Sequence, residues 1–288
     1  MESKHPEVVG FFEEKTFSVQ YVCIDNNTLR CAIIDPVLNF DENSATTSTE
    51  SADEIIALVR DRGLTVDWIL DTHPHADHLS AAVYLQEHLD APRGIGEHVI
   101  DVQKLWKDIY NFGDDFPSDG RQWDRLFADG DTFEVGDLQA RVMHSPGHTL
   151  ASITYVIGDA AFVHDTLFMP DFGTARADFP GGDAGTLYRS IQRILDLPDA
   201  TRVFTGHDYM PNGREPRWES TVAEQRHHNP HLQDMTESDY IKLRNERDAE
   251  LPLPALMLAA LQINTRGGRL PEPEDNGTAY LKIPLNAF

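Results

Sequence analysis

Thr72-His73-Pro74-His75-Ala76-Asp77-His78 is the stretch that indicates the fold, because it places three imidazoles and one carboxylate within six residues. The apolar run before it, residues 66–70, predicts a buried strand, and residues 79–88 after it predict a helix. The cluster is therefore expected on a strand-to-helix loop, where α/β scaffolds present their chemistry. Imidazole is the commonest protein ligand of transition metals, and a carboxylate adds a hard oxygen. The stretch predicts a metal site.

Three later segments supply matching side chains at wide intervals: His148, Asp165 and His207. Each comes after a short apolar run that is typical of a strand, so each is expected near a strand end. The three runs are residues 140–143, 161–163 and 202–204. A single histidine at a strand end is more often structural than a ligand. Three such groups beside the 73–78 cluster favour ligands.

On these residues the chain resembles the metallo-β-lactamase superfamily. The motif H-x-H-x-D-H is matched by His73, His75, Asp77 and His78, and His148, Asp165 and His207 follow in the family's order. The resemblance runs from about residue 19 to 230 and implies an α/β fold, the αββα sandwich: two β-sheets face to face, helices outside, and metal at one edge. In two-metal members, His73, His75 and His148 would hold one ion and Asp77, His78 and His207 the other, with Asp165 bridging.

Within the superfamily, Arg176-Ala177-Asp178-Phe179 is similar to the R-x-D-F of the persulfide dioxygenases. That branch implies one Fe(II) per chain, held by His73, His148 and Asp165, with adjacent open positions for the persulfide sulfur and O₂. His75, Asp77, His78 and His207 would then orient the ligands and share protons. The chain departs from the pattern at His164, where many relatives have Gly, and at residues 170–173, which replace a Gly-Cys-Gly type of turn.

The same residues also allow a second hypothesis about the function. A glyoxalase II-like hydrolase would hold two Zn(II), or a mixed Zn/Fe pair, and cleave a glutathione thioester. A metal-binding or regulatory protein without catalysis is disfavoured, because every ligand position of the motif is intact.

The resemblance implies a small anionic thiol as substrate, such as glutathione persulfide, together with O₂. Arg176 is the first candidate to bind a substrate carboxylate, since a guanidinium can form two parallel hydrogen bonds. Asp178, the acid of the same motif, is also a candidate for the substrate site, and an internal pair between Arg176 and Asp178 is the alternative for Arg176. Tyr209, next to His207, is the second candidate. Arg217 and Arg266 are weaker ones, and a surface salt bridge is the alternative for Arg217.

Composition and charge limit the partners and the cellular location that we expect. The chain has 288 residues, 48 acidic against 24 basic, and a formal net charge of −24, which disfavours nucleic acid or an anionic membrane as partner. No apolar run approaches the roughly 20 residues of a membrane span, and residues 1–6 lack a signal-peptide layout, so a cytoplasmic protein is expected. The scarcity of lysine, 6 against 18 arginines, favours a salt-adapted source over an ordinary acidic bacterial enzyme.

One domain is expected over residues 1–288, with about 231–288 as a C-terminal extension packed on it. The apolar end of that extension, residues 280–285, should pack on the core or on a second subunit, so a homodimer stays open. Cys23 and Cys31 flank the Asn26-Asn27 turn of a predicted hairpin and are expected to be core side chains.

Local patterns predict further elements. Helices are expected over residues 99–110, 184–195 and 216–228, and after Thr236 to about residue 249. Ser51 and Glu54 predict a capping box ahead of a helix that Gly63 closes. Residues 39–50 are expected as a surface loop, and residues 111–130 as a long loop that overhangs the site.

Overall fold

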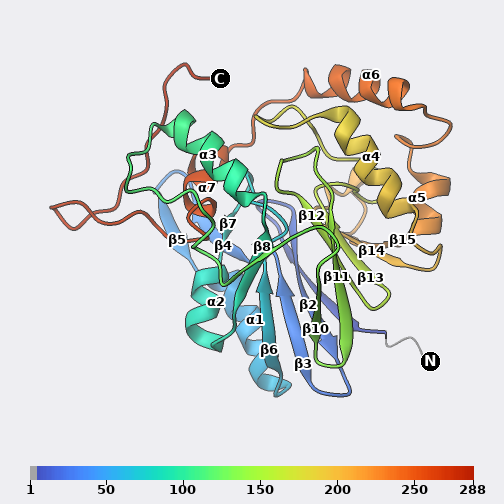
Figure 1. Cartoon of the computed structure of the whole chain (residues 1–288), viewed down its shortest axis with the longest axis horizontal. Helices are drawn as coiled ribbons and strands as arrows, with labels where there is room; N and C mark the ends of the chain where they lie inside the picture. The colour runs from blue at the N-terminus through green and yellow to red at the C-terminus, as the bar shows by residue number, and fades with distance from the viewer. Residues whose placement is uncertain (1–4) are drawn as a thin grey trace.

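The computed structural model describes residues 5–288. Residues 1–4, on which the expectation about a signal peptide partly rests, lie outside the described residues. Two six-stranded sheets face each other at the centre, with α1 and α2 on one side and α4 and α5 on the other (Figure 1). The predicted αββα sandwich is confirmed.

The first sheet follows the order β1-β2-β3-β6-β8-β9, antiparallel from β1 to β3 and parallel thereafter. Its strands are β1 (Glu7–Glu13), β2 (Ser18–Asp25), β3 (Arg30–Ile34), β6 (Thr65–Leu70), β8 (Arg93–Gly96) and β9 (Arg125–Phe127). The second sheet follows the order β10-β11-β12-β13-β14-β15, with one parallel pair, β13 and β14. Its strands are β10 (Thr132–Val135), β11 (Leu138–His144), β12 (Ile153–Ile157), β13 (Ala160–His164), β14 (Arg202–Thr205) and β15 (Glu219–Thr221).

Seven α-helices are seen in residues 5–288: α1 (Glu50–Asp61), α2 (Ala82–Leu89), α3 (Val99–Tyr110), α4 (Ala184–Leu195), α5 (Val222–His228), α6 (Glu237–Asp248) and α7 (Met257–Asn264). A short 3₁₀ turn, η1, covers Pro211–Gly213. A third sheet, order β5-β4-β7, joins β5 (Thr46–Ser48), β4 (Val37–Asp41) and β7 (Leu79–Ser80).

Strand β2 is buried along its whole length because both of its faces are covered. Tyr21 and Cys23 face the second sheet, in a core that includes Tyr155 and Phe162. Residues on the other face of the first sheet pack with α1 and α2, and the outer face of the second sheet packs with α4. Each sheet is thus buried on two sides, and the strand ends carry the loops that reach solvent.

The hairpin prediction around Asn26-Asn27 is confirmed. Cys23 pairs with Ala32 and Cys31 with Ile24, so the two thiols point to opposite faces of the sheet. Both cysteines are buried and free, in separate cores. The bounds predicted for α3 and α4 match the structure, and Thr236 caps α6 with Asp239 as expected.

Several local predictions are wrong. Residues 39–50 are not a loop, since β4 and β5 form a hairpin there. Ser51 does not cap α1: the helix begins at Glu50, and both the backbone and the hydroxyl of Ser51 bond the Asn39 side chain.

Helix α5 begins at Val222 rather than at 216, because residues 219–221 pair with β14. Likewise α2 begins at Ala82 rather than at 79, because Leu79 and Ser80 pair with β4.

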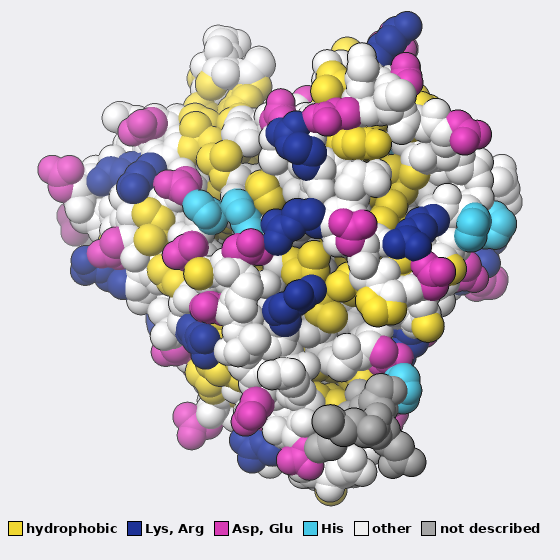
Figure 2. Space-filling model, turned by 45° about the vertical axis from the view of Figure 1, so that its right-hand side comes forward, with side chains coloured by type: hydrophobic (Ala, Val, Ile, Leu, Met, Phe, Trp, Pro, Cys, Tyr) yellow, Lys and Arg dark blue, Asp and Glu magenta, His cyan; other side chains and the backbone are white. Residues whose placement is uncertain are grey.

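Acidic and basic side chains are interspersed on the face that Figure 2 shows, rather than gathered into one patch of either sign. Across residues 5–288, no helix combines the length and the apolar character that crossing a bilayer requires. The C-terminal segment runs along the outside of α3 and α7 (Figure 1), where Leu281 packs on a small core while Ile283 and Leu285 are exposed.

Candidate metal centre

The donor side chains meet at one edge of the sandwich, on the loops that follow strands of both sheets. The 73–78 loop follows β6 of the first sheet, whereas His148, Asp165 and His207 follow β11, β13 and β14 of the second. Several sets of three have ligand atoms within 4.8 Å of one another, among them His73, His148 and Asp165. The strand ends, which are far apart in sequence, bring the seven predicted residues into one cluster.

Three imidazoles of this cluster each have one nitrogen held by a hydrogen bond and the other free. The Nδ1 of His148 donates to the carbonyl oxygen of Arg176 at 2.8 Å, which leaves Nε2 as a free lone pair. The Nε2 of His75 donates to Asp35 at 2.9 Å, so its Nδ1 is free. The Nδ1 of His78 donates to Asp77 at 3.0 Å, so its Nε2 is free. These contacts fix tautomers in the way that partners of metal-bound histidines do.

Asp35, at the end of β3, holds the loop that carries the motif. Its carboxylate accepts from the backbone N–H of Thr72 at 2.7 Å, from the Thr72 hydroxyl at 3.0 Å and from His75. Because the Thr72 hydroxyl donates to Asp35, its oxygen is left to accept from the Nδ1 of His73, 3.1 Å away. The Nε2 of His73 therefore also carries a lone pair.

Whether a metal fits can be judged from the buried donor atoms that lack a hydrogen-bond partner. Buried nitrogens without a hydrogen-bond partner are costly, and here they include the Nε2 of His73 and of His78 and the Nδ1 of His75, together with one oxygen of Asp165. All of them belong to a donor set of the kind that binds iron or zinc. A divalent cation would satisfy those of the atoms that ligate it, so the residues present fit a metal.

The electrostatics agree with that fit. Burial, with further help from neighbouring imidazoles, holds the pKa of His73 and of His75 well below the ordinary value, so both are neutral and ready to bind. Burial alone would raise the pKa of Asp165, but His207 and His164 hold it well below its usual range. Against the effect of burial, Asp165 and Asp77 raise the pKa of His207 to about 10. The cluster thus favours charged carboxylates beside a site for positive charge.

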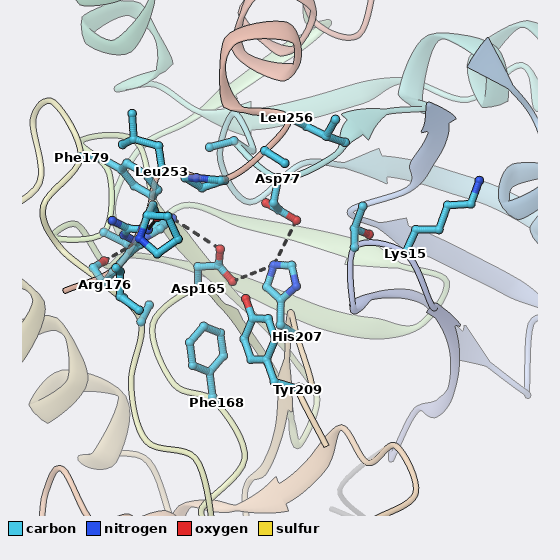
Figure 3. A pocket seen from close by; sticks show the side chains of 18 of the residues that line it. Lys15, Asp77, Asp165, Phe168, Arg176, Phe179, His207, Tyr209, Leu253 and Leu256 are labelled. Atoms are coloured by element: carbon cyan, nitrogen blue, oxygen red, sulfur yellow. Dashed lines mark hydrogen bonds and ion pairs between the residues drawn. The ribbon is translucent and has the colours of Figure 1, made fainter. Parts of the chain in front are cut away.

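A cavity of about 880 Å³ opens onto the cluster. His148, Asp165, Asp77 and His207 line it, whereas His73, His75 and His78 lie behind them. Figure 3 shows Asp77 and Asp165 facing His207, with Phe168 and Tyr209 beside them, Arg176 on one side and Lys15 on the other. The rest of the wall is largely apolar and includes the segment 251–256, which lies just before α7.

Arg176 lines the cavity, but its side chain is already paired. It donates two hydrogen bonds to Asp178, at 2.7 and 2.8 Å, and one to the carbonyl oxygen of Pro252 at 2.7 Å. Its guanidinium also lies over the ring of Phe179, 4.8 Å from the centroid. Of the two roles considered from the sequence, the internal pair with Asp178 is present.

The other predicted substrate residues separate into two groups. Tyr209 lines the cavity and stacks on His207, with the ring centroids 5.6 Å apart. Arg217 lies outside this cavity and pairs with Asp171 on the surface. Arg266 lies over Phe112 and Phe116 and does not line the cavity either. The structure therefore does not bring Arg217 and Arg266 to the metal cluster.

Residues 111–130, which include strand β9, do not overhang the site, contrary to the sequence prediction. Phe116 and Trp123 of this segment are buried, and Trp123 packs in one core with α3 and α7, so the segment is held away from the cavity.

Sequence reasoning missed three kinds of residue at the site. Asp35 had a signal, because an acid follows the apolar strand β3 just as Asp165 follows β13. Lys15 and Arg247 line the cavity and form no ion pair with any other side chain of residues 5–288, yet no motif marks them. Asn264, on α7, also has no signal in the sequence, although it bonds the backbone of the motif loop.

Residues 18–207 match the family described as the metallo-beta-lactamase superfamily, a stretch that runs from β2 to His207 and contains every donor of the cluster. This chain belongs to the metallo-beta-lactamase superfamily. Within it, the chain is 64% identical to the Beta-lactamase hydrolase-like protein of Xylella fastidiosa (strain 9a5c), over 98% of this chain but 65% of that protein. The chain thus spans a little under two thirds of that relative's length.

Other members of the superfamily match along nearly their whole length. Identity is 48% to Glyoxylase B2 of Dictyostelium discoideum, over 99% of this chain and 98% of that protein. It is 30% to the mitochondrial persulfide dioxygenase ETHE1 of Bos taurus, over 89% and 87%. The crystal structure of ETHE1 from Myxococcus xanthus has a TM-score of 0.72 and 30% identity, over 91% of this chain and 100% of that one.

Proposed function

We propose that this chain is a dioxygenase for low-molecular-weight persulfides, with one Fe(II) held by His73, His148 and Asp165. The observation that carries the proposal is the state of Asp77. Its Oδ2 already accepts from His78 at 3.0 Å and from the hydroxyl of Ser18 at 3.1 Å, so one of the two carboxylate oxygens that could bind a second ion is engaged by the protein. The set of two histidines and one carboxylate leaves adjacent positions open, as non-haem iron oxygenases do.

Bound Fe(II) supplies the redox chemistry by which O₂ oxidises the terminal sulfur. For glutathione persulfide the balance is one persulfide, one O₂ and one water giving glutathione, sulfite and two protons. The chain's own part is to hold the ligands through Asp35 and the Arg176 carbonyl, and to limit the water around the reacting sulfur with the apolar wall of Phe168, Phe172 and Phe179.

The cavity also suits an anionic thiol on a strongly acidic protein. Lys15 and Arg247 line it without ion-pair partners among residues 5–288, and both are exposed. Tyr209 adds a hydroxyl close to the cluster. A thiol that carries carboxylates, such as glutathione, would find cations at the rim and an apolar interior for its reacting end.

A second candidate, a hydrolase of glutathione thioesters with two metal ions, is favoured by a different observation. The Nε2 of His78 has no hydrogen-bond partner, and His207 lies 3.3 Å from both Asp77 and Asp165. These atoms would suit a second ion, Zn(II) or iron. The 48% identity to Glyoxylase B2 agrees with this alternative.

Two measurements distinguish the candidates. Protein purified without added metal should contain one iron per chain and consume O₂ with sulfite as product when glutathione persulfide is added. The Asp165→Ala variant, which lacks a ligand under both candidates, is the control and should lose metal and activity. Rapid turnover of S-lactoylglutathione, without O₂ consumption on the persulfide, would overturn the proposal.

The number of ions can be tested separately by comparing two variants. Asp165→Ala removes one of three ligands of a single iron and should empty the site. His207→Ala removes a residue that only orients the ligands, so affinity should fall by roughly 10- to 100-fold. Equal loss of metal in the two variants would indicate a two-metal centre.

A further inference from the structure

His164, directly before Asp165, is a buried imidazole for which neither candidate reaction has a role. It ends strand β13 with a backbone φ of 39°, in the left-handed region that residues other than glycine rarely adopt. Its side chain is almost wholly buried. A side chain kept in such a conformation inside a cluster of ligands indicates a function for the ring, because a glycine would fit the backbone without strain.

Neither nitrogen of His164 makes a hydrogen bond, although both lie close to other donor atoms of the cluster. Nδ1 is 3.2 Å from Oδ1 of Asp165 and Nε2 is 3.4 Å from Oδ2 of Asp35, which is ion-pair distance, but neither buried nitrogen makes a hydrogen bond. His73, His75 and His78 differ, because in each of them the protein engages one nitrogen and leaves the other bare. In His164, by contrast, neither nitrogen makes a hydrogen bond.

The chain provides space for this ring at Gly206. A Cβ at Gly206 would lie 2.5 to 2.6 Å from ring atoms of His164, closer than any real contact. His164 precedes Asp165 and Gly206 precedes His207. The ring at position 164 occupies the space that a side chain at position 206 would need.

We propose that His164 is an additional nitrogen ligand of the metal centre, on the side away from the cavity. Its nitrogens lie within 4.8 Å of ligand atoms of His73 and His75, and also of Asp165 and His207. The Nδ1 of His164 and the Oδ1 of Asp165 lie 3.2 Å apart, close enough to bind one ion. His164 does not line the cavity, so its ligation leaves the substrate side open. The inference concerns metal binding and is independent of the reaction proposed above.

The test is the His164→Gly variant, measured on metal-loaded protein without any substrate. Metal affinity, determined by competition with a chelator, should fall about tenfold or more. X-ray absorption at the metal edge should count one imidazole fewer than in the parent protein. The melting temperature of the metal-free protein is measured alongside, because glycine relieves the left-handed backbone but leaves the space of a buried ring empty.

Gly206→Ala gives a second variant that changes no ligand residue. It should displace the ring of His164 and lower metal affinity in the parent chain, but have little effect in the His164→Gly background, where the methyl group has space. Such non-additivity is expected when two residues act through one contact. If His164→Gly keeps the parent's metal affinity and imidazole count, or if Gly206→Ala acts equally in both backgrounds, His164 is only a packing residue and the proposal fails.

Discussion

At the scale of single residues, Arg176 supports the cavity through two different groups. Its backbone carbonyl orients His148, and its side chain connects Asp178 with Pro252 of the cavity wall. Because a substitution to alanine keeps the carbonyl, the two roles can be separated by experiment.

Arg176→Ala should lower the melting temperature by a few degrees and leave the iron content unchanged. The lost charged hydrogen bonds are worth about 1–2 kcal/mol once partial exposure is allowed for, and 1 kcal/mol shifts a domain of this size by roughly 2–4 °C. Arg176→Lys should recover only part, since an ammonium cannot form the paired contact. Thermal melts and iron analysis check this. A many-fold rise in KM at an unchanged melting temperature would instead make Arg176 a substrate ligand.

Under the proposed function, Arg247→Ala should raise KM for glutathione persulfide by about two- to fivefold, the range expected for an exposed ion pair. Arg247 lines the cavity and has no ion pair among residues 5–288, so its charge is available to an anionic thiol. Arg217→Ala is the matched control, because Arg217 is an exposed cation outside the cavity. Steady-state kinetics at low salt should show no change for the control. Equal effects of the two variants would point to the general surface charge rather than to a binding contact.

At the scale of secondary-structure elements, helix α7 supports the metal-binding loop. The side-chain amide of Asn264 donates to the carbonyl oxygens of His75 and His78, at 2.8 Å each, and its oxygen accepts from the backbone N–H of Ser80 at 2.8 Å. The asparagine is buried, so water cannot replace these bonds.

Asn264→Ala should therefore weaken metal binding, by about tenfold, without removing any ligand. Chelator competition measures the effect, and Asn276→Ala, in the exposed C-terminal segment, is the control. Unchanged affinity in a folded Asn264→Ala protein would show that α7 packs on the loop without positioning it.

The elements that sequence predicted well are those with complete local signals. Helix α4 has an apolar stripe and the capping side chain of Asp183, and the structure confirms its bounds. The β4–β5 hairpin was missed because its Ser- and Thr-rich residues are typical of a loop, and partners elsewhere decide their pairing. Ser51 does not cap the helix as expected, because its hydroxyl accepts a hydrogen bond from Asn39, a residue outside the helix.

The residues of the site likewise differ in how well the sequence predicted them. A short motif and three strand-end residues predict the ligands, because adjacent strand ends converge in space. The support of those ligands was not predictable, since Asn264 lies 189 residues from His75 and no local pattern connects them. The partner of Arg176, Pro252, lies 76 residues away and has no polar side chain to mark it.

At the scale of the whole molecule, a net charge of −24 implies mutual repulsion that salt can screen. The melting temperature should therefore rise between about 0.02 and 1 M KCl, with most of the gain where the screening length falls below roughly 10 Å. Calorimetry at constant pH and metal loading measures the change. A melting temperature that falls with salt would show that the surface ion pairs stabilise the fold more than the excess negative charge destabilises it.

The division of the ligands between two sheets has a consequence for how the protein is made. His78, the last histidine of the motif loop, is synthesised 129 residues before His207. At about 5–20 residues per second that interval lasts roughly 6–26 s. During it the nascent chain presents His73, His75 and His78 without the second-sheet ligands, and Asn264 is not yet made to hold their loop. Any ion caught at that time is weakly held and exchangeable, so the metal that the finished protein retains is selected only after the second sheet has docked.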